Sequence, residues 1–109
     1  MRTVEVYHNN ILAGLLIEEN RHHYIFRYDD TYFMDEGKPA ISLTLPKTQK
    51  EYSSDSLFPY FFNMLSEGVN RKMQSIQLRI DEEDHMGLLA ATAQYDTIGP
   101  VTIKPVTTL

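Results

Sequence analysis

Apolar and polar residues alternate with a period of two in three stretches of the first half of the chain. Near the N-terminus, Val4 and Val6 alternate with Thr3 and Glu5, the pattern of a strand with one buried face. The same alternation recurs at residues 24–28 and 41–45. The last of these strands is expected to end at Pro46, because proline has no N–H to donate to a sheet.

A hairpin is predicted between the first strand and a returning strand at residues 11–17. The pair Asn9-Asn10 separates them, and asparagine tolerates the positive φ angles of a tight turn. Gly14, inside the returning strand, predicts a bulge or a close backbone approach. An acidic loop follows the third strand at residues 29–38, with a short helical turn at residues 32–34.

The aromatic-rich segment 53–71 is predicted to start with a helix. Ser54 or Asp55 is the expected N-cap, and Pro59 fits only near the first turn. Gly68 is the expected stop. The residues that share one helical face are Leu57, Phe58, Phe61, Phe62 and Leu65. These aromatic residues are interpreted as core, and the polar loop 47–52 is expected before them.

Two more helices and a strand complete the prediction. Val69, Met73, Ile76 and Ile80 repeat at helical spacing and are expected to face inward. The expected outward residues of this second helix are Arg71, Lys72, Gln74 and Arg79. Asp84 is expected to cap a third helix that runs to about Ala93, with Leu89 and Ala90 inward. After a turn at residues 97–100, the last strand contains Val101 and Ile103 and stops at Pro105.

This order of elements predicts an α+β fold. Strands that are segregated from helices indicate a small, mostly antiparallel five-stranded sheet, with three helices inserted before the last strand. A length of 109 residues predicts one domain over residues 1–109.

Composition narrows the function classes. The chain has no cysteine, which removes disulfides and thiolate metal sites. A net charge of −5 and a pI of about 5.2 argue against direct nucleic-acid binding, which needs a basic surface. No apolar run reaches the length of a membrane span, and the N-terminus lacks the apolar segment of a signal peptide. A soluble cytoplasmic protein without membrane contacts is expected.

No residue pattern predicts a catalytic site, a cofactor site or a metal site. His22 and His23 are adjacent, so in a strand they point to opposite faces and do not share a metal. The carboxylates cluster in charge runs, which are typically solvated. The chain also lacks a glycine-rich phosphate loop and the common hydrolase and metalloprotease motifs. The protein is therefore predicted not to be an enzyme.

The segment after the aromatic helix is the candidate contact site. It offers an acid, a flexible glycine, an amide and a guanidinium within five positions: Glu67, Gly68, Val69, Asn70 and Arg71. On composition alone, a plain turn between two helices explains the same residues. The absence of catalytic motifs favours a binding or regulatory role.

Four segments in order resemble the N-terminal subdomain of HipA-type toxin kinases. Residues 38–46, KPAISLTLP, resemble the family's PLSLSLP segment, and residues 54–65, SDSLFPYFFNML, resemble the helix that follows it. Glu67-Gly68 falls at the family's EG position. Residues 96–103, DTIGPVTI, are similar to the strand that closes the subdomain. The resemblance covers roughly residues 1–106.

The resemblance implies a split system. It does not extend to the kinase core of full-length members, so kinase activity is not implied for this chain. The chain is similar to the HipS-like protein, which is the small antitoxin of HipBST-type toxin–antitoxin systems. Such a protein docks on the N-lobe of a separately encoded HipA-like Ser/Thr kinase, near the nucleotide site. A third, helix-turn-helix protein supplies DNA binding. Residues 67–71 are then the expected kinase contacts.

Two other interpretations stay open. Ser66 stands where relatives have proline, and Val69 where they often have a bulkier residue. A small side chain there favours a subunit that completes or activates the split kinase over one that blocks it. An unrelated small ligand-binding domain is the other alternative.

Overall fold

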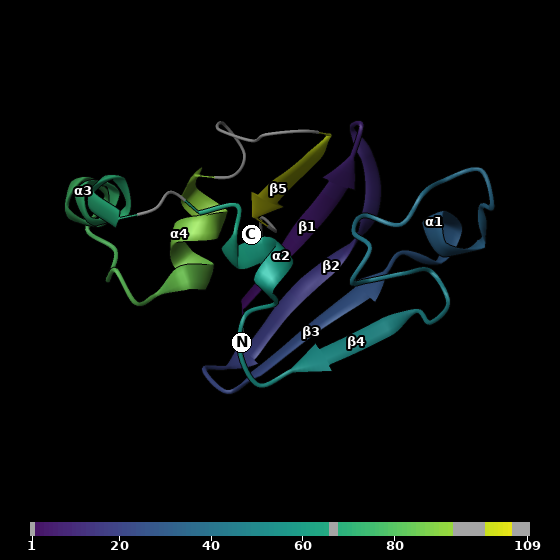
Figure 1. Ribbon diagram of the computed structural model, residues 1–109, viewed down its shortest axis with the longest axis horizontal. Coiled ribbons are helices and arrows are strands. Elements are labelled where there is room, and N and C mark those ends of the chain that lie inside the picture. The colour runs from purple at the N-terminus through teal and green to yellow at the C-terminus, as the bar shows by residue number, and fades with distance from the viewer. Residues whose placement is uncertain (1, 66–67, 93–99, 106–109) are drawn as a thin grey trace.

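The computed structural model describes residues 2–65, 68–92 and 100–105, and for residues 68, 69 and 105 it describes the backbone alone. These residues form a five-stranded antiparallel sheet of order β4-β3-β2-β1-β5, with short helices around it (Figure 1). The strands are β1 (Arg2–His8), β2 (Ile11–Asn20), β3 (His23–Tyr28), β4 (Glu51–Ser54) and β5 (Val101–Pro105). The helices are α1 (Asp30–Met34), α2 (Pro59–Phe62), α3 (Gly68–Leu78) and α4 (His85–Thr92). The α+β prediction is confirmed.

The β1–β2 hairpin has the predicted turn. Asn9 and Asn10 have φ angles of 49° and 66°, as a tight two-residue turn requires. Both predictions for Gly14 are also confirmed. The register between β1 and β2 shifts beside it, and a Cβ on Gly14 would lie 2.4 Å from the carbonyl oxygen of Arg27 in β3. Only glycine lets these two strands approach so closely.

One face of the sheet forms the core. Alternate residues of the strands are fully buried there, among them Val6, Leu16 and Phe26. Phe61 of α2 and Leu88 and Leu89 of α4 join the same apolar cluster. The aromatic segment is therefore core, as predicted. Among the described helices, none has the length and the apolar character needed to cross a membrane.

The predicted fourth strand at residues 41–45 is wrong. Ile41 and Leu45 are buried but Leu43 is fully exposed, because a turn closed by the bond from the Leu45 N–H to the Ser42 carbonyl interrupts the chain. The hydroxyl of Tyr28 accepts from the Ile41 N–H and donates to the Leu45 carbonyl. A side chain thus satisfies backbone groups that a strand would have paired, and the polar segment Glu51–Ser54 takes the edge position instead.

The predicted bounds of the aromatic helix are also wrong. It begins at Pro59, with Phe58 at the N-cap, and ends at Phe62, so neither Ser54 nor Asp55 caps it. Proline is favoured at the first helical position because its missing N–H has no partner there in any case. Gly68 does not stop this helix; it is the first residue of α3.

The C-terminal part agrees with the prediction where the structure describes it. The carboxylate of Asp84 accepts from the Gly87 N–H at 3.1 Å, as an N-cap does, and Leu89 is buried. The strand β5 pairs with β1. Ala93 and residues 97–99 of the expected turn lie outside the described residues.

Candidate partner-binding site

The predicted contact residues lie where α3 begins. Glu67 lies outside the described residues, and Gly68 and Val69 are placed by their backbone as the first two residues of α3. Asn70 is exposed and Arg71 is half-buried. The structure therefore places four of the five residues in one turn of one helix.

The side chain of Arg71 turns toward the domain. Its guanidinium carbon lies 5.4 Å from the ring centre of Phe62 in α2, within the range of a cation–π contact. The rings of Phe62 and of His85, at the start of α4, also make a T-shaped contact with centres 4.9 Å apart. Arg71 Nε is buried and has no hydrogen-bond partner among the described residues. Arg71 thus connects α3 to α2, and Phe62 connects α2 to α4.

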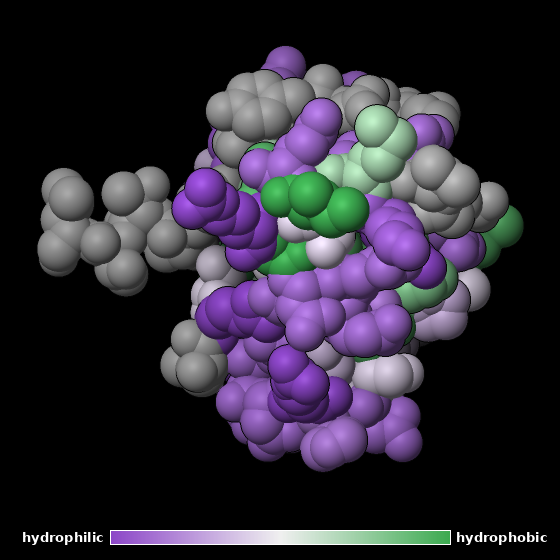
Figure 2. Space-filling model, turned by 90° about the vertical axis from the view of Figure 1, so that its left-hand side faces the viewer, coloured by the Kyte–Doolittle hydropathy of each residue, from purple (hydrophilic) through white to green (hydrophobic). Residues whose placement is uncertain are grey.

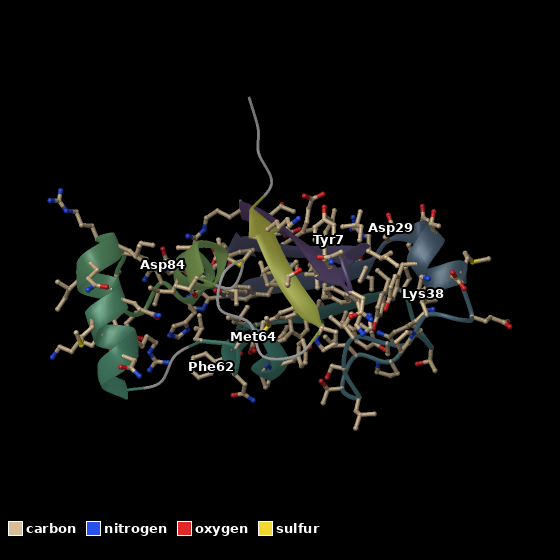
Figure 3. The ribbon with its side chains drawn as sticks, turned by 90° about the horizontal axis from the view of Figure 1, so that it is seen from above. Tyr7, Asp29, Lys38, Phe62, Met64 and Asp84 are labelled. Carbon is tan, nitrogen blue, oxygen red and sulfur yellow. The ribbon has the colours of Figure 1, made fainter. Side chains whose placement is uncertain are left out.

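The helix α3 has the opposite orientation to the one predicted. The half-buried residues in its middle are the polar Arg71, Gln74 and Ser75, which share a face at spacings of three and four. Met73 and Ile76 lie on the other face and are 52% and 68% exposed. Of the described side chains in the stripe expected to face inward, which are those of Met73, Ile76 and Ile80, only Ile80 packs against the core. In Figure 3, α3 lies at the rim of the molecule, beyond Phe62 and Asp84.

The end of α3 is well defined. Arg79 has a φ angle of 56°, and its N–H donates to the Ile76 carbonyl at 3.3 Å, while the Ile80 N–H donates to the Ser75 carbonyl at 3.0 Å. These two bonds form a Schellman motif, in which a residue in the left-handed region closes the helix. The hydroxyl of Ser75 adds a bond to the Ile80 carbonyl.

An ionic cluster holds α4, and with it this end of the molecule, against the sheet. The guanidinium of Arg2 in β1 donates to Asp84 at the start of α4 and to the buried carboxylate of Glu18 in β2. The hydroxyl of Tyr24 donates to Glu18 at 2.7 Å. The bonds from Arg2 lower the pKa of Asp84. Burial, then the bond to Glu18, raise the pKa of Tyr24 to about 12.

A shallow cavity of about 340 Å³ lies beside the aromatic contact. Its lining residues are Ser56, Leu57, Pro59, Phe62, Asn63 and His85. They offer one imidazole, one hydroxyl and one amide, which is too little for an acid–base pair with a positioned nucleophile. Within residues 2–65, 68–92 and 100–105, no three or more metal-binding side chains come together.

The exposed apolar residues of α3 are the feature that sequence reasoning missed. Periodicity shows that Met73 and Ile76 share a helical face, but it does not show whether that face meets the core or the solvent. One signal was available. The segment 68–79 carries Arg71, Lys72 and Arg79 and no acidic residue, in a chain of net charge −5.

Comparison with known proteins identifies the fold. The family described as the HipA N-terminal domain matches residues 4–104. The chain belongs to this family. An uncharacterized protein of Haemophilus influenzae is 33% identical over 104 residues, which are 95% of this chain and 92% of that protein. A solved structure of the N-terminal domain of HipA toxin superposes with a TM-score of 0.74 at 27% identity, covering 100% of this chain and 96% of that one.

Membership in the HipA N-terminal domain family confirms the resemblance seen in the sequence. The antiparallel sheet and its helices are those of the HipA N-terminal domain. The family and the solved structure that match are both the N-terminal domain of HipA, and neither is a kinase catalytic domain.

Proposed function

We propose that this protein is a non-catalytic regulatory subunit that binds a separately encoded HipA-like Ser/Thr kinase and acts as its antitoxin. The observation that carries the proposal is the match of nearly the whole chain to the HipA N-terminal domain. In this proposal the domain supplies a docking surface, and the phosphoryl-transfer chemistry belongs to the separately encoded kinase. DNA binding is assigned to a separate helix-turn-helix protein in the same complex.

The described residues support a binding role. They contain no cluster of metal-binding side chains. Of the six exposed large apolar side chains among the described residues, three lie on α3, the helix that begins at the predicted contact residues Gly68, Val69, Asn70 and Arg71. Protein interfaces are built around such apolar side chains with polar residues at their rim.

Co-expression with the adjacent kinase gene tests the proposal. The kinase alone is expected to arrest growth, and this protein is expected to relieve the arrest and to co-purify with the kinase. If growth arrest is unchanged and no complex forms, the proposal fails.

The alternative, a subunit that completes or activates the kinase, predicts the opposite sign in one measurement. Val69, smaller than the residue often found at this position in relatives, favours it. Kinase autophosphorylation is measured with and without this protein. A decrease supports the antitoxin, and an increase together with complex formation supports the activating subunit.

A further inference from the structure

The outward face of α3 carries an apolar ridge that nothing in the described structure covers. The ridge is defined here as Met73 and Ile76, one turn apart and more than half exposed. Figure 2 views the side of the molecule where α3 lies, and it shows hydrophobic surface enclosed by hydrophilic residues. Isolated apolar residues are common on surfaces, but a ridge along one helical face needs a physical explanation.

The orientation of α3 is the first part of that explanation. An isolated helix shorter than about 12–15 residues is marginal in water, and most helices in proteins are stabilised by packing their apolar face. The helix α3 has 11 residues, and its polar face is the one that meets the domain. The contact between Arg71 and Phe62 attaches it to the domain, and the Schellman motif at Arg79 closes its C-terminal end. Packing within the described domain therefore does not account for the apolar face of α3.

Charge gives the second part. Residues 68–79, which are α3 and the residue that follows it, carry no anion and three cations: Arg71, Lys72 and Arg79. Lys72 and Arg79 are exposed. Arg71 packs against Phe62, so Lys72 and Arg79 are the exposed cations of this segment.

We infer that the ridge docks into an apolar groove on the kinase partner, and that carboxylate side chains border this groove. The inference rests on the proposed function and names the surface that makes the contact. Met73 and Ile76 enter the groove as anchors, in the manner of an amphipathic helix laid into a hydrophobic groove. Lys72 and Arg79 pair with the bordering carboxylates and steer the encounter.

Two other occupants fit the charges less well. Two copies of the chain that packed ridge against ridge would bring the cations of both helices together. An anionic membrane attracts the cations of α3, but the chain as a whole carries a net charge of −5, which opposes its approach. Neither objection applies to a protein groove that is bordered by acidic residues.

Binding of purified variants to the purified kinase tests the inference. Ile76→Asp and Met73→Asp are expected to raise the Kd by about tenfold or more, as for anchor residues of an interface. Met34→Asp is the matched control, because Met34 at the end of α1 is 76% exposed and α1 lies at the opposite end of the molecule from α3 (Figure 1). This variant is expected to leave the Kd unchanged. Each variant is at an exposed position, and its urea midpoint verifies that the domain still folds.

Charge reversal supplies an independent measurement. Lys72→Glu is expected to slow association and to weaken its dependence on salt. Lys104→Glu in β5, also at an exposed position, is the control and is expected to change neither. Amide exchange in α3 is expected to slow when the kinase binds.

The outcomes separate the two proposals. If the unmodified protein binds the kinase and the ridge variants bind equally well, the docking inference is wrong and the proposed function stands. If the unmodified protein does not bind, both are wrong. If Ile76→Asp instead abolishes self-association in sedimentation, or binding to phosphatidylserine vesicles, the ridge has another occupant and the inference is overturned.

Discussion

Arg2 and Asp84 lie 82 positions apart in the chain and are joined by two hydrogen bonds of 3.0 and 2.6 Å. The pair connects the first strand to the cap of α4. Gly87 makes room for it, since a Cβ at that position would lie 2.4 Å from the Asp84 carboxylate. The carboxylate therefore has two functions, closing a helix and fastening that helix to the sheet.

Asp84→Asn is expected to lower the free energy of unfolding at neutral pH by about 1–2 kcal/mol, because it replaces charge-assisted bonds with neutral ones while keeping a good N-cap residue. The pKa of Asp84 is lower in the folded state than in the unfolded state. Its contribution is thus complete above the ordinary carboxyl pKa and is lost as the pH falls through the folded-state pKa. Urea unfolding between neutral and acid pH measures both effects.

Glu83→Gln is the matched control for Asp84→Asn. The side chain of Glu83 is 80% exposed, so this variant is expected to change stability by less than about 0.5 kcal/mol. Equal stability of the Asp84→Asn protein and the unmodified protein at neutral pH would show that the bonds to Arg2 contribute nothing.

Much of the sheet could be predicted because its signals are local. Alternation marks β1, β3 and β5, and Asn9-Asn10 marks the first turn. The strand β4 could not be found, because Glu51–Ser54 is polar and gains its place from pairing with β3. Residues 41–45 alternate like a strand, yet the Tyr28 hydroxyl, from another element, takes up their backbone groups. Long-range contacts of this kind leave no trace in local periodicity.

The same limit applies to the candidate site. The sequence placed Asn70 and Arg71 after the aromatic helix, where the structure has the first turn of α3, but it expected Arg71 to face outward, and the structure packs this side chain against Phe62. It assigned the ridge residues Met73 and Ile76 to the core, since an amphipathic pattern specifies a face and not its environment. Figure 3 shows why the environment differs: α3 stands beside the sheet and not over it.

Tyr28→Phe is expected to destabilise the domain by about 1–3 kcal/mol, because it leaves a buried N–H of Ile41 and the carbonyl of Leu45 without their partner. The loop that presents Leu43 is expected to loosen first. Urea unfolding gives the magnitude, and amide exchange at Ile41 gives the location. Tyr60→Phe is the control, since the Tyr60 hydroxyl makes no hydrogen bond within the described part of the chain. Unchanged exchange at Ile41 in the Tyr28→Phe protein would contradict the bridging role.

Arg79→Gly is expected to stabilise the protein by about 0.5–1 kcal/mol. A non-glycine residue in the left-handed region costs about 1–2 kcal/mol, and glycine removes this strain at the price of a more flexible unfolded chain. Lys72→Gly, within the same helix, is expected to do the reverse and cost about 1 kcal/mol. Thermal unfolding of the two variants gives the signs. A loss of stability in both would mean that the Arg79 side chain contributes more than its backbone strain costs.

The protein is expected to lose stability in alkaline solution because Tyr24, whose hydroxyl donates to Glu18, then ionises. Burial and the bond to Glu18 raise the pKa of Tyr24 to about 12, above the ordinary value of 10.0. Its contribution is complete below the unfolded-state pKa and is lost as the pH rises through the folded-state pKa. Burial also raises the pKa of Tyr28 to about 12, so the Tyr24→Phe protein is expected to lose one late-titrating group from the tyrosinate absorbance and to keep that of Tyr28. The pH dependence of urea unfolding should flatten in the same variant. If all tyrosines titrate near their ordinary pKa while the protein stays folded, the buried Tyr24–Glu18 pair does not exist in solution.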